Sequence, residues 1–347
     1  MERKQTLSKQ IKRHSKLPVK KEQEYDGNFE SIISTGSTLV DLAISGKRIR
    51  GGGIPGGILL EVFGPSQSGK SVFLSELAGE VERKGGEDQF HDPEARLDQE
   101  FSAIFGMHIK AENYHQPNTV TELFGNVRKW EPKAKKGIIH GIFADSLAAL
   151  STDMEMEEED GDKMGGRRAK EFSEQLRKTC RIIKQKNYIM ACSNQLRMKM
   201  NTTKYEEKYT TPGGEAVKFY ASIRLKFSTP EKLDDTIKVA GKEIKKIIGI
   251  KTMVEAVKTV DEPYRKAPLY IIYGYGIDDI RANLQYIKDY TSNTVYQVGD
   301  IVLDKSMEES IAMVEEQDLV LELKNEVIDL WEAIEAKFKT ERKPKMR

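Results

Sequence analysis

The chain has 347 residues, with 56 Lys and Arg against 55 Asp and Glu, so its formal net charge is +1. This balance excludes a uniformly basic nucleic-acid coat protein, although it permits local segregation of charge. Two cysteines and five scattered histidines argue against a disulfide framework and a transition-metal site. We find no secretory leader and no run of about 20 apolar residues, so we expect a soluble, cytosolic protein with no membrane partner.

Charge is unevenly distributed along the chain. The first 21 residues contain eight Lys or Arg and one Glu. Residues 153–162 contain seven acidic side chains, and basic residues follow at once: Lys163, Arg167, Arg168 and Lys170. The last eleven residues carry six basic groups and one Glu. Each run fits either a solvated face or a binding segment, and the sequence alone leaves both interpretations open.

Short apolar runs alternate with amphipathic helical segments between residues 57 and 275. The expected strands are Ile58–Phe63, Ile138–Asp145, Tyr188–Ser193, Ser222–Phe227 and Ile247–Val257. The stretch after Gly166 is predicted to be helical, with one apolar face formed by Phe172, Leu176, Cys180 and Ile183. This alternation predicts an α/β fold with a doubly wound, mainly parallel sheet. A further helix is expected from about Glu308 to Phe338.

The first chemical motif is a phosphate-binding loop. The octapeptide Gly64-Pro65-Ser66-Gln67-Ser68-Gly69-Lys70-Ser71 fits G-x-x-x-x-G-K-[ST], follows an apolar strand and opens a helix that carries Val72. Its glycines let successive backbone N–H groups point at phosphate oxygens, and the helix N-terminus adds partial positive charge. Lys70 would neutralise the β- and γ-phosphates, and the Ser71 hydroxyl would hold Mg²⁺. We therefore expect a nucleoside triphosphate site.

Acidic residues are expected at the ends of the neighbouring strands. The apolar run Gly141–Ala144 ends at Asp145, which would complete the Mg²⁺ site. Hydrolysis also needs a group that orients or deprotonates water, and Asp92 and Glu94 lie about 25 residues past the loop. By chemistry alone either carboxylate could serve.

A long polar loop, Met198–Pro212, is expected inside this core, and such loops are generally functional. It mixes lysines with Met and Tyr side chains that can wedge or stack against bases. That composition suits binding of single-stranded DNA without sequence preference. A plain surface excursion is the alternative.

These motifs together resemble the RecA family of DNA recombinases over about residues 30–290. The segments that carry the resemblance are Ile33–Leu42, the phosphate loop, Pro93–Asp98, Ala144–Leu150, Ser193–Lys199, Gly213–Leu225 and Tyr273–Ile277. The resemblance implies a RecA-type P-loop ATPase core at 33–277, a basic N-terminal assembly segment at 1–32, and a small α+β C-terminal domain with a basic tail at 278–347.

The resemblance also implies roles for individual residues. Glu94 would activate water, Gln195 would sense the γ-phosphate, and Lys218 and Lys258 would reach the ATP of a neighbouring subunit. Asp98 and Phe101 would contact adenine. The DNA-binding loops would span about 157–170 and 196–212, and the DNA-binding residues would be Arg167, Arg168, Lys170, Arg197, Met198, Lys199, Lys204, Tyr205, Gly213 and Gly214.

The expected function is that of an ATP-dependent recombinase. It would form a helical homo-oligomeric filament on single-stranded DNA, pair it with duplex DNA and exchange strands, with single-strand-binding or mediator proteins as further partners. The rivals are a ring-forming helicase or translocase on the same core, and a nucleotide-gated DNA-binding mediator with little turnover. The acidic tail of the family is missing, and Val260 stands where a second interface lysine is expected. These departures suggest a divergent member in the bacterial cytosol, such as one encoded by a phage.

Overall fold

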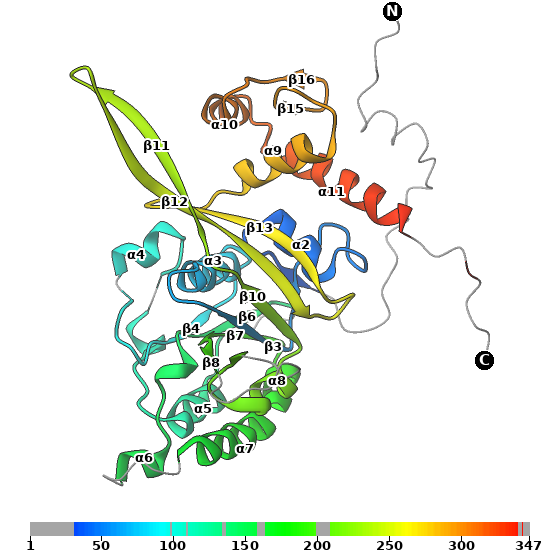
Figure 1. Ribbon diagram of the computed structural model, residues 1–347. Helices are drawn as coiled ribbons and strands as arrows, with labels where there is room; N and C mark the ends of the chain where they lie inside the picture. The colour runs from blue at the N-terminus through cyan, green and yellow to red at the C-terminus, as the bar shows by residue number, and fades with distance from the viewer. Residues whose placement is uncertain are drawn as a thin grey trace, which may run out of the picture.

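The computed structural model describes residues 31–97, 99–108, 110–133, 137–157, 164–198, 209–338 and 342. Its centre is a ten-stranded mixed sheet with helices on both faces (Figure 1). The strand order is β14-β13-β12-β10-β3-β7-β6-β4-β5, and β11 pairs with β12 outside this path.

Six neighbouring strands form the parallel half of the sheet. They are β10 (Ile223–Phe227), β3 (Ile58–Gly64), β7 (Tyr188–Gln195), β6 (His140–Ala144), β4 (Asp88–His91) and β5 (Tyr114–His115). Every residue of β3 and β6 is buried, because helices cover both faces of the sheet. The four strands that the sequence predicts in this half are confirmed, with ends shifted by one or two residues.

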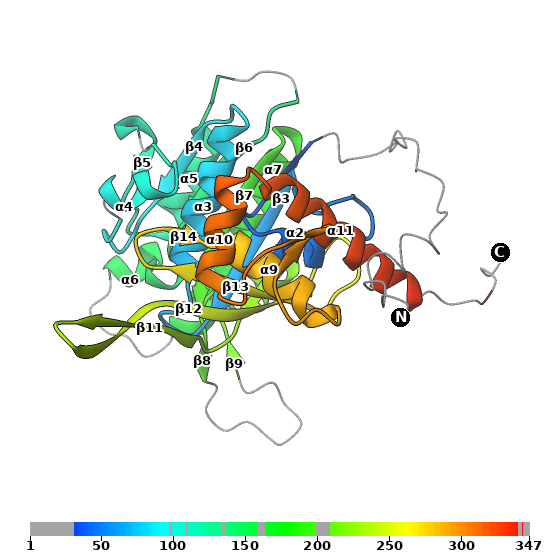
Figure 2. The ribbon, with the colours of Figure 1, turned by 90° about the horizontal axis from the view of Figure 1, so that it is seen from above.

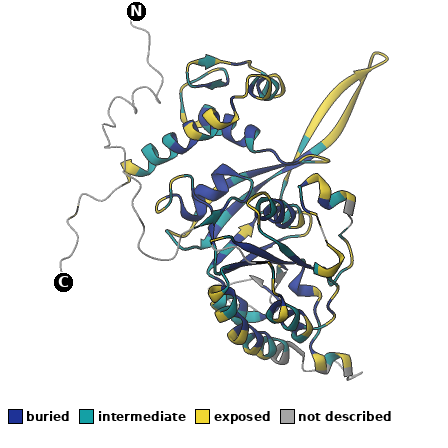
Figure 3. Cartoon of the chain, turned by 180° about the vertical axis from the view of Figure 1, so that it is seen from behind, coloured by how far each residue is buried: buried dark blue, intermediate teal, exposed yellow. Residues whose placement is uncertain are grey.

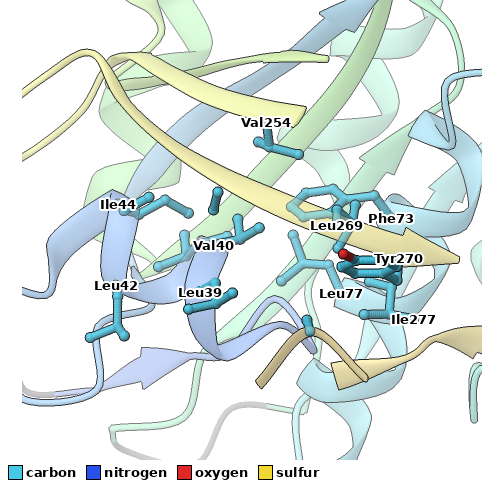
Figure 4. Packing of buried hydrophobic residues seen from close by; sticks show 14 of the residues in the cluster. Leu39, Val40, Leu42, Ile44, Phe73, Leu77, Val254, Leu269, Tyr270 and Ile277 are labelled. Atoms are coloured by element: carbon cyan, nitrogen blue, oxygen red, sulfur yellow. The ribbon is translucent and has the colours of Figure 1, made fainter. Parts of the chain in front are cut away.

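Alternating side chains of β3 enter two separate cores. Leu60 packs in a cluster with α2 (Thr38–Ser45) and α3 (Lys70–Arg83), which Figure 4 shows from close by. Leu59 packs in a second cluster with α5 (Val120–Lys129), α7 (Met164–Gln185) and α8 (Gly214–Tyr220). The doubly wound architecture is therefore confirmed.

The antiparallel half consists of β11 (Glu231–Val239), β12 (Lys242–Lys258), β13 (Arg265–Ile272) and β14 (Gly276–Ile277). The sequence predicts only Ile247–Val257 of β12 and misses β11, β13 and β14. All residues of β11 except Leu233 are exposed, and only Leu233, Ile237 and Val239 of its nine residues are apolar, so the apolar pattern of the strand is weak. The β11–β12 hairpin projects from the body of the molecule as an exposed arm (Figures 1 and 3).

Strand β4 is polar for a buried strand, yet it lies inside the sheet between β6 and β5. Gln89 bridges two histidines: its Oε1 lies 3.1 Å from Nε2 of His91, and its Nε2 lies 3.1 Å from Nε2 of His115 on β5. The two imidazole rings stack with centroids 5.2 Å apart. Burial lowers the pKa of His91 to about 3, so this histidine is neutral in the core.

The C-terminal elements pack onto α2. They are α9 (Asp279–Tyr290), β15 (Gln297–Val298), β16 (Ile301–Val302), α10 (Met307–Glu316) and α11 (Val320–Lys337). The Asp279 carboxylate accepts hydrogen bonds from the backbone N–H and the hydroxyl of Thr38, both at 2.7 Å. The single helix expected from Glu308 to Phe338 is wrong, because the chain turns at Asp318, whose φ is +53°, and forms two helices.

The remaining described elements are short: β1 (Ile32–Ile33), β2 (Ile54–Pro55), α4 (Gln99–Ile104), α6 (Asp153–Glu157), β8 (Arg197–Met198), β9 (Tyr209–Thr210), and 3₁₀ turns at Ala111–Asn113 and Leu147–Ala149. The loop expected at 157–170 differs from the structure, because Met164–Lys170 already belong to α7. The buried apolar residues of α7 that the structure describes lie farther along the helix, at Phe172, Leu176 and Ile183.

Candidate nucleotide and DNA site

The phosphate-binding loop joins the central strand β3 to α3, as the motif requires. A side chain at Gly64 would put its Cβ 2.6 Å from the carbonyl oxygen of Phe227 on β10, so glycine is needed for this close approach. Gly69 has a φ of +91° and immediately precedes α3. The hydroxyl of Ser68 donates to the carbonyl of Pro65 at 2.8 Å and closes the loop. These contacts fix an anion-binding turn at a helix N-terminus.

Lys70 lies across this loop. Its ammonium donates to the carbonyl oxygens of Pro65 at 2.6 Å and Gly64 at 3.3 Å. Burial lowers the pKa of Lys70, and the carboxylates of Asp145 and Glu94 act in the opposite direction. The lysine predicted for the phosphates and the two predicted acidic residues thus share one electrostatic environment.

The ends of β4 and β6 bring the two acidic residues to the same edge of the sheet. Glu94 accepts a hydrogen bond from the Ser146 hydroxyl at 3.1 Å and forms an ion pair with Arg96 at 2.7 Å. Asp145 accepts a hydrogen bond from the hydroxyl of Ser193, at the end of β7. The sequence analysis did not assign these two serines to the site. The available signal was a hydroxyl side chain close to the end of a buried strand.

Asp92, the other carboxylate that could activate water, instead holds the backbone of its own segment in place. It is buried, and its Oδ2 accepts hydrogen bonds from the backbone N–H of Leu97 at 2.8 Å and from the Tyr114 hydroxyl at 2.9 Å. These bonds hold the segment that carries Glu94. Asp92 is therefore occupied in shaping the turn.

Gln195 ends β7 at the same edge and is exposed. The preceding residue, Asn194, is buried and its amide donates to Oε1 of Glu61 and to the carbonyl of Pro212, both at 3.0 Å. Oε2 of Glu61 accepts from Nε of Arg224 at 2.6 Å. The network connects three central strands to the end of the predicted DNA loop. Sequence reasoning missed this network, although a charge inside each of two apolar strands was a signal.

The glycine pair of the second loop packs against α7. Gly213 has a φ of +86° and caps α8, and a Cβ there would lie 2.8 Å from Cγ2 of Val217. A Cβ at Gly214 would lie 3.4 Å from Cβ of Ala169, which belongs to the predicted first DNA segment. The roots of the two predicted DNA-binding segments are thus side by side.

The two lysines predicted to reach a neighbouring subunit meet at α8. The ammonium of Lys258 donates to the carbonyls of Lys218 at 3.0 Å and Phe219 at 3.1 Å, the last turn of the helix. Burial lowers the pKa of Lys258, and the charge of Arg224 lowers it further. Lys218 pairs with Glu215 at 3.0 Å, and the Phe219 side chain is 76 % exposed.

The remaining residues predicted to contact DNA or nucleotide are spread over several elements. Arg168 on α7 lies 3.9 Å from Glu155 and is mostly buried, whereas Lys170 is exposed. Phe101 on α4 makes an edge-to-face contact with Phe105 at 4.9 Å, and Val72 packs against the core. Arg167 lies in the first turn of α7, and Arg197 and Met198 form β8. Four predicted residues lie outside the described residues: Asp98, Lys199, Lys204 and Tyr205.

The donor set at the loop fits Mg²⁺ only in company with a nucleotide. The Ser71 hydroxyl and the Asp145 carboxylate are oxygen ligands of the type that Mg²⁺ prefers. Within the described ranges, no group of three or more His, Cys, Asp or Glu residues could hold a metal ion by itself. Phosphate oxygens would supply the missing ligands.

A phosphate loop on the central strand of a doubly wound sheet, with carboxylates at the ends of adjacent strands, defines a P-loop nucleotide-binding protein. The sequence model of the RecA N-terminal domain matches residues 3–278. The chain is 33% identical to Protein RecA of Borrelia hermsii over 301 residues, which cover 85% of this chain and 80% of the relative. It is 32% identical to Protein RecA of Thermus thermophilus over 305 residues, which cover 86% and 85%. The chain belongs to the RecA family.

Membership of this family agrees with the resemblance expected from the sequence motifs. Among the described residues, none of the helices combines the length and the apolar character that a membrane span requires.

Proposed function

We propose that the chain is an ATP-dependent recombinase that assembles into a helical filament on single-stranded DNA and exchanges strands with a homologous duplex. The observation that carries the proposal is the connection from the nucleotide to the DNA loop. Gln195 ends the strand beside the phosphate loop. The side-chain amide of the preceding residue, Asn194, donates a hydrogen bond to the carbonyl of Pro212, which ends the predicted DNA loop.

In the proposed reaction Glu94 orients and deprotonates the water that attacks the γ-phosphate. Ser146 holds one oxygen of that carboxylate, and Lys70 stabilises charge that develops on the transferred phosphoryl group. Bound Mg²⁺, held through Ser71 and Asp145, would neutralise phosphate charge. Gln195 would respond to the γ-phosphate and bias the position of the loop.

The DNA side of the proposal uses the two segments that meet beside Gly214. Lys170 and the lysines of the second segment would contact phosphates, and Met198 and Tyr205 would contact bases. Base pairing would supply sequence recognition, because these residues hold backbone and stacking surfaces and do not read base edges. Single-strand-binding or mediator proteins would be further partners.

The subunit interface in the proposal includes α8. Phe219 is exposed on this helix, and Lys258 with Lys218 lies at its end, where they would approach ATP held by the next protomer. Such a contact would couple nucleotide state to filament geometry.

Three measurements test the proposal. We expect single-stranded DNA to stimulate ATP hydrolysis. Electron microscopy with a slowly hydrolysed ATP analogue should show helical filaments on that DNA. A labelled complementary strand should move from a homologous duplex into a new duplex with the single strand held in the filament. Closed rings with ATP-driven unwinding would instead establish a helicase. DNA binding without stimulated hydrolysis would establish a mediator.

A further inference from the structure

The arm formed by β11 and β12 has an unusual tip. Residues 237–246 contain four lysines and one glutamate. Figures 1 and 2 both show the arm extending away from the ATPase core and from the C-terminal helices, and Figure 3 shows that its outer part is exposed. Two exposed strands joined by a tight turn need a partner to cover any apolar side chains they present.

The two faces of the arm differ in chemistry. On one face the register sets Ile237 opposite Ile244 and Val239 opposite Lys242, and the three apolar side chains are 55%, 48% and 48% exposed for Ile237, Val239 and Ile244. Lys246 lies on this face also, opposite Asp235. We call this surface the apolar arm face.

The opposite face of the arm has one exposed aliphatic side chain, Ile247 at 40%, and its lysines are paired. Lys238 pairs with Glu243 at 3.6 Å, and Lys245 pairs with Asp234 at 2.8 Å. Within the part of the chain that the structure describes, Lys242 and Lys246 form no ion pair at the 4.0 Å limit. The lysines without an ion-pair partner therefore flank the apolar side chains, and the paired lysines face the other way.

A complementary surface lies where α10 turns into α11. Val320 and Leu321 are 44% and 71% exposed there. Residues 315–322 contain four acidic side chains and no basic one, and the four are exposed: Glu315, Glu316, Asp318 and Glu322. No ion pair of these carboxylates is found among the described residues. We call this surface the acidic corner.

We propose that the apolar arm face of one protomer binds the acidic corner of a second copy of this chain. Apolar side chains would be buried in the middle of the contact, with lysines against carboxylates at its edge, as in a typical protein interface. A DNA partner fits less well, because the lysines of the arm flank exposed aliphatic side chains and half of them are already paired.

The geometry of the contact suits an open assembly. Both surfaces are exposed in the single chain, and the arm extends away from α10 (Figures 1 and 2). Because the two surfaces differ, a protomer can use its arm on one neighbour and its corner on another, and such a head-to-tail contact builds an open helical array when its rotation does not close into a ring. The inference rests on the proposed filament and adds a second contact outside the ATP interface.

Cross-linking tests the contact directly. Chains carrying Ile244→Cys and chains carrying Leu321→Cys are mixed without DNA and treated with a short bis-maleimide. We expect a covalent dimer in the mixture and not in either variant alone; the separate variants also account for Cys180 and Cys192. Equal dimer in the separate samples, or none in the mixture, overturns the contact.

Charge exchange tests its role in assembly. We expect Lys242→Glu/Lys246→Glu to raise the protein concentration for half-maximal filament formation about fivefold, and Glu315→Lys/Glu316→Lys to do the same. Combining all four substitutions should recover much of the lost assembly, because the exchanged pairs again carry opposite charges, while Asp318 and Glu322 keep theirs. Lys238→Glu/Lys245→Glu is the matched control on the opposite face and should have a smaller effect that the corner variant does not rescue.

The outcomes separate this inference from the proposed function. If wild-type protein forms filaments but the variant that combines all four substitutions shows no recovery of assembly, the contact is absent and the recombinase proposal stands. If the arm variant loses duplex DNA affinity in fluorescence anisotropy with no rescue, the arm is a DNA surface and the inference is wrong. If wild-type protein forms no filament, the proposed function fails, and the cross-link still reports on the contact.

Discussion

The hydroxyl of Ser146 donates a hydrogen bond to Oε1 of Glu94 at 3.1 Å, and it links the end of β6 to the segment after β4. These two strands are neighbours in the sheet, so their ends meet at one edge. The bond leaves Oε2 of Glu94 with Arg96 as its partner, an exposed side chain that can move. A carboxylate held on one side and free to exchange its partner on the other suits proton transfer.

Replacing Glu94 with Gln should lower DNA-stimulated ATP hydrolysis by about 10²–10⁴-fold, because the amide cannot accept a proton from water. Nucleotide affinity, measured with a fluorescent ATP analogue, should change little, since Lys70 and the phosphate loop remain. Glu100→Gln is the matched control, an exposed carboxylate on the nearby α4. Unchanged hydrolysis in Glu94→Gln would assign water activation to another group.

Gly64→Ala should distort the phosphate loop, because the new Cβ would lie 2.6 Å from the backbone carbonyl of Phe227. We expect a loss of about 1–3 kcal/mol in the free energy of unfolding and weaker nucleotide binding. Gly125→Ala on α5 has no atom within 4 Å of the new Cβ and should stabilise the helix by about 1 kcal/mol with normal nucleotide binding. Urea denaturation and nucleotide titration would distinguish the pair.

Arg224→Ala should leave the fully buried carboxylate of Glu61 without its cation. Breaking a buried pair from one side costs about 3–5 kcal/mol, and we expect a loss of that size in urea denaturation. The control is Arg50→Ala, whose side chain is 53% exposed beside Asp329 and Glu332 and whose removal should cost about 0–1 kcal/mol. Similar losses for both arginines would contradict the assigned burial.

Stability should fall with rising pH because of Asp41. Burial raises its pKa to about 7, although the hydroxyl of Ser34, the backbone N–H and hydroxyl of Thr35 and the charge of Lys324 oppose that shift. The folded state binds this proton more tightly than the unfolded chain, so the contribution is complete below about pH 4 and is lost as pH rises through 7.

Asp41→Asn removes this titration. In urea denaturation between pH 5 and 8, the stability of the wild type should decline relative to that of the variant as pH rises. Parallel pH profiles for the two proteins would show that the carboxyl does not titrate in this range.

Lys258→Ala should lower DNA-stimulated ATP hydrolysis by at least about tenfold if the ammonium meets the nucleotide of a neighbouring protomer. The substitution also removes two hydrogen bonds at the end of α8, so the unfolding free energy must be measured in parallel. Lys266→Ala, an exposed lysine on β13, is the control. Unchanged hydrolysis in Lys258→Ala would argue against a role across the interface.

The local motifs were predictable because their chemistry is contiguous in the chain. Gly64–Ser71 needs a strand before it and a helix after it, and all three parts are adjacent in sequence. Apolar runs such as Ile58–Phe63 predicted buried strands, since burial on both faces requires continuous apolar side chains. The family resemblance, four of the six strands of the parallel half and the candidate residues near their ends followed from such segments.

The sequence by itself therefore determined the P-loop core, the family and the chemical types at the nucleotide site. Only the tertiary structure decided which polar groups meet, because hydrogen bonds such as Asn194 to Glu61 join residues 133 positions apart. It also decided the length of the β11–β12 arm and the break between α10 and α11. The arm is mostly exposed, so its strands lack the continuous apolar pattern that predicts a buried strand. The break between the two helices depends on one turn at Asp318, which does not interrupt the apolar periodicity of the segment.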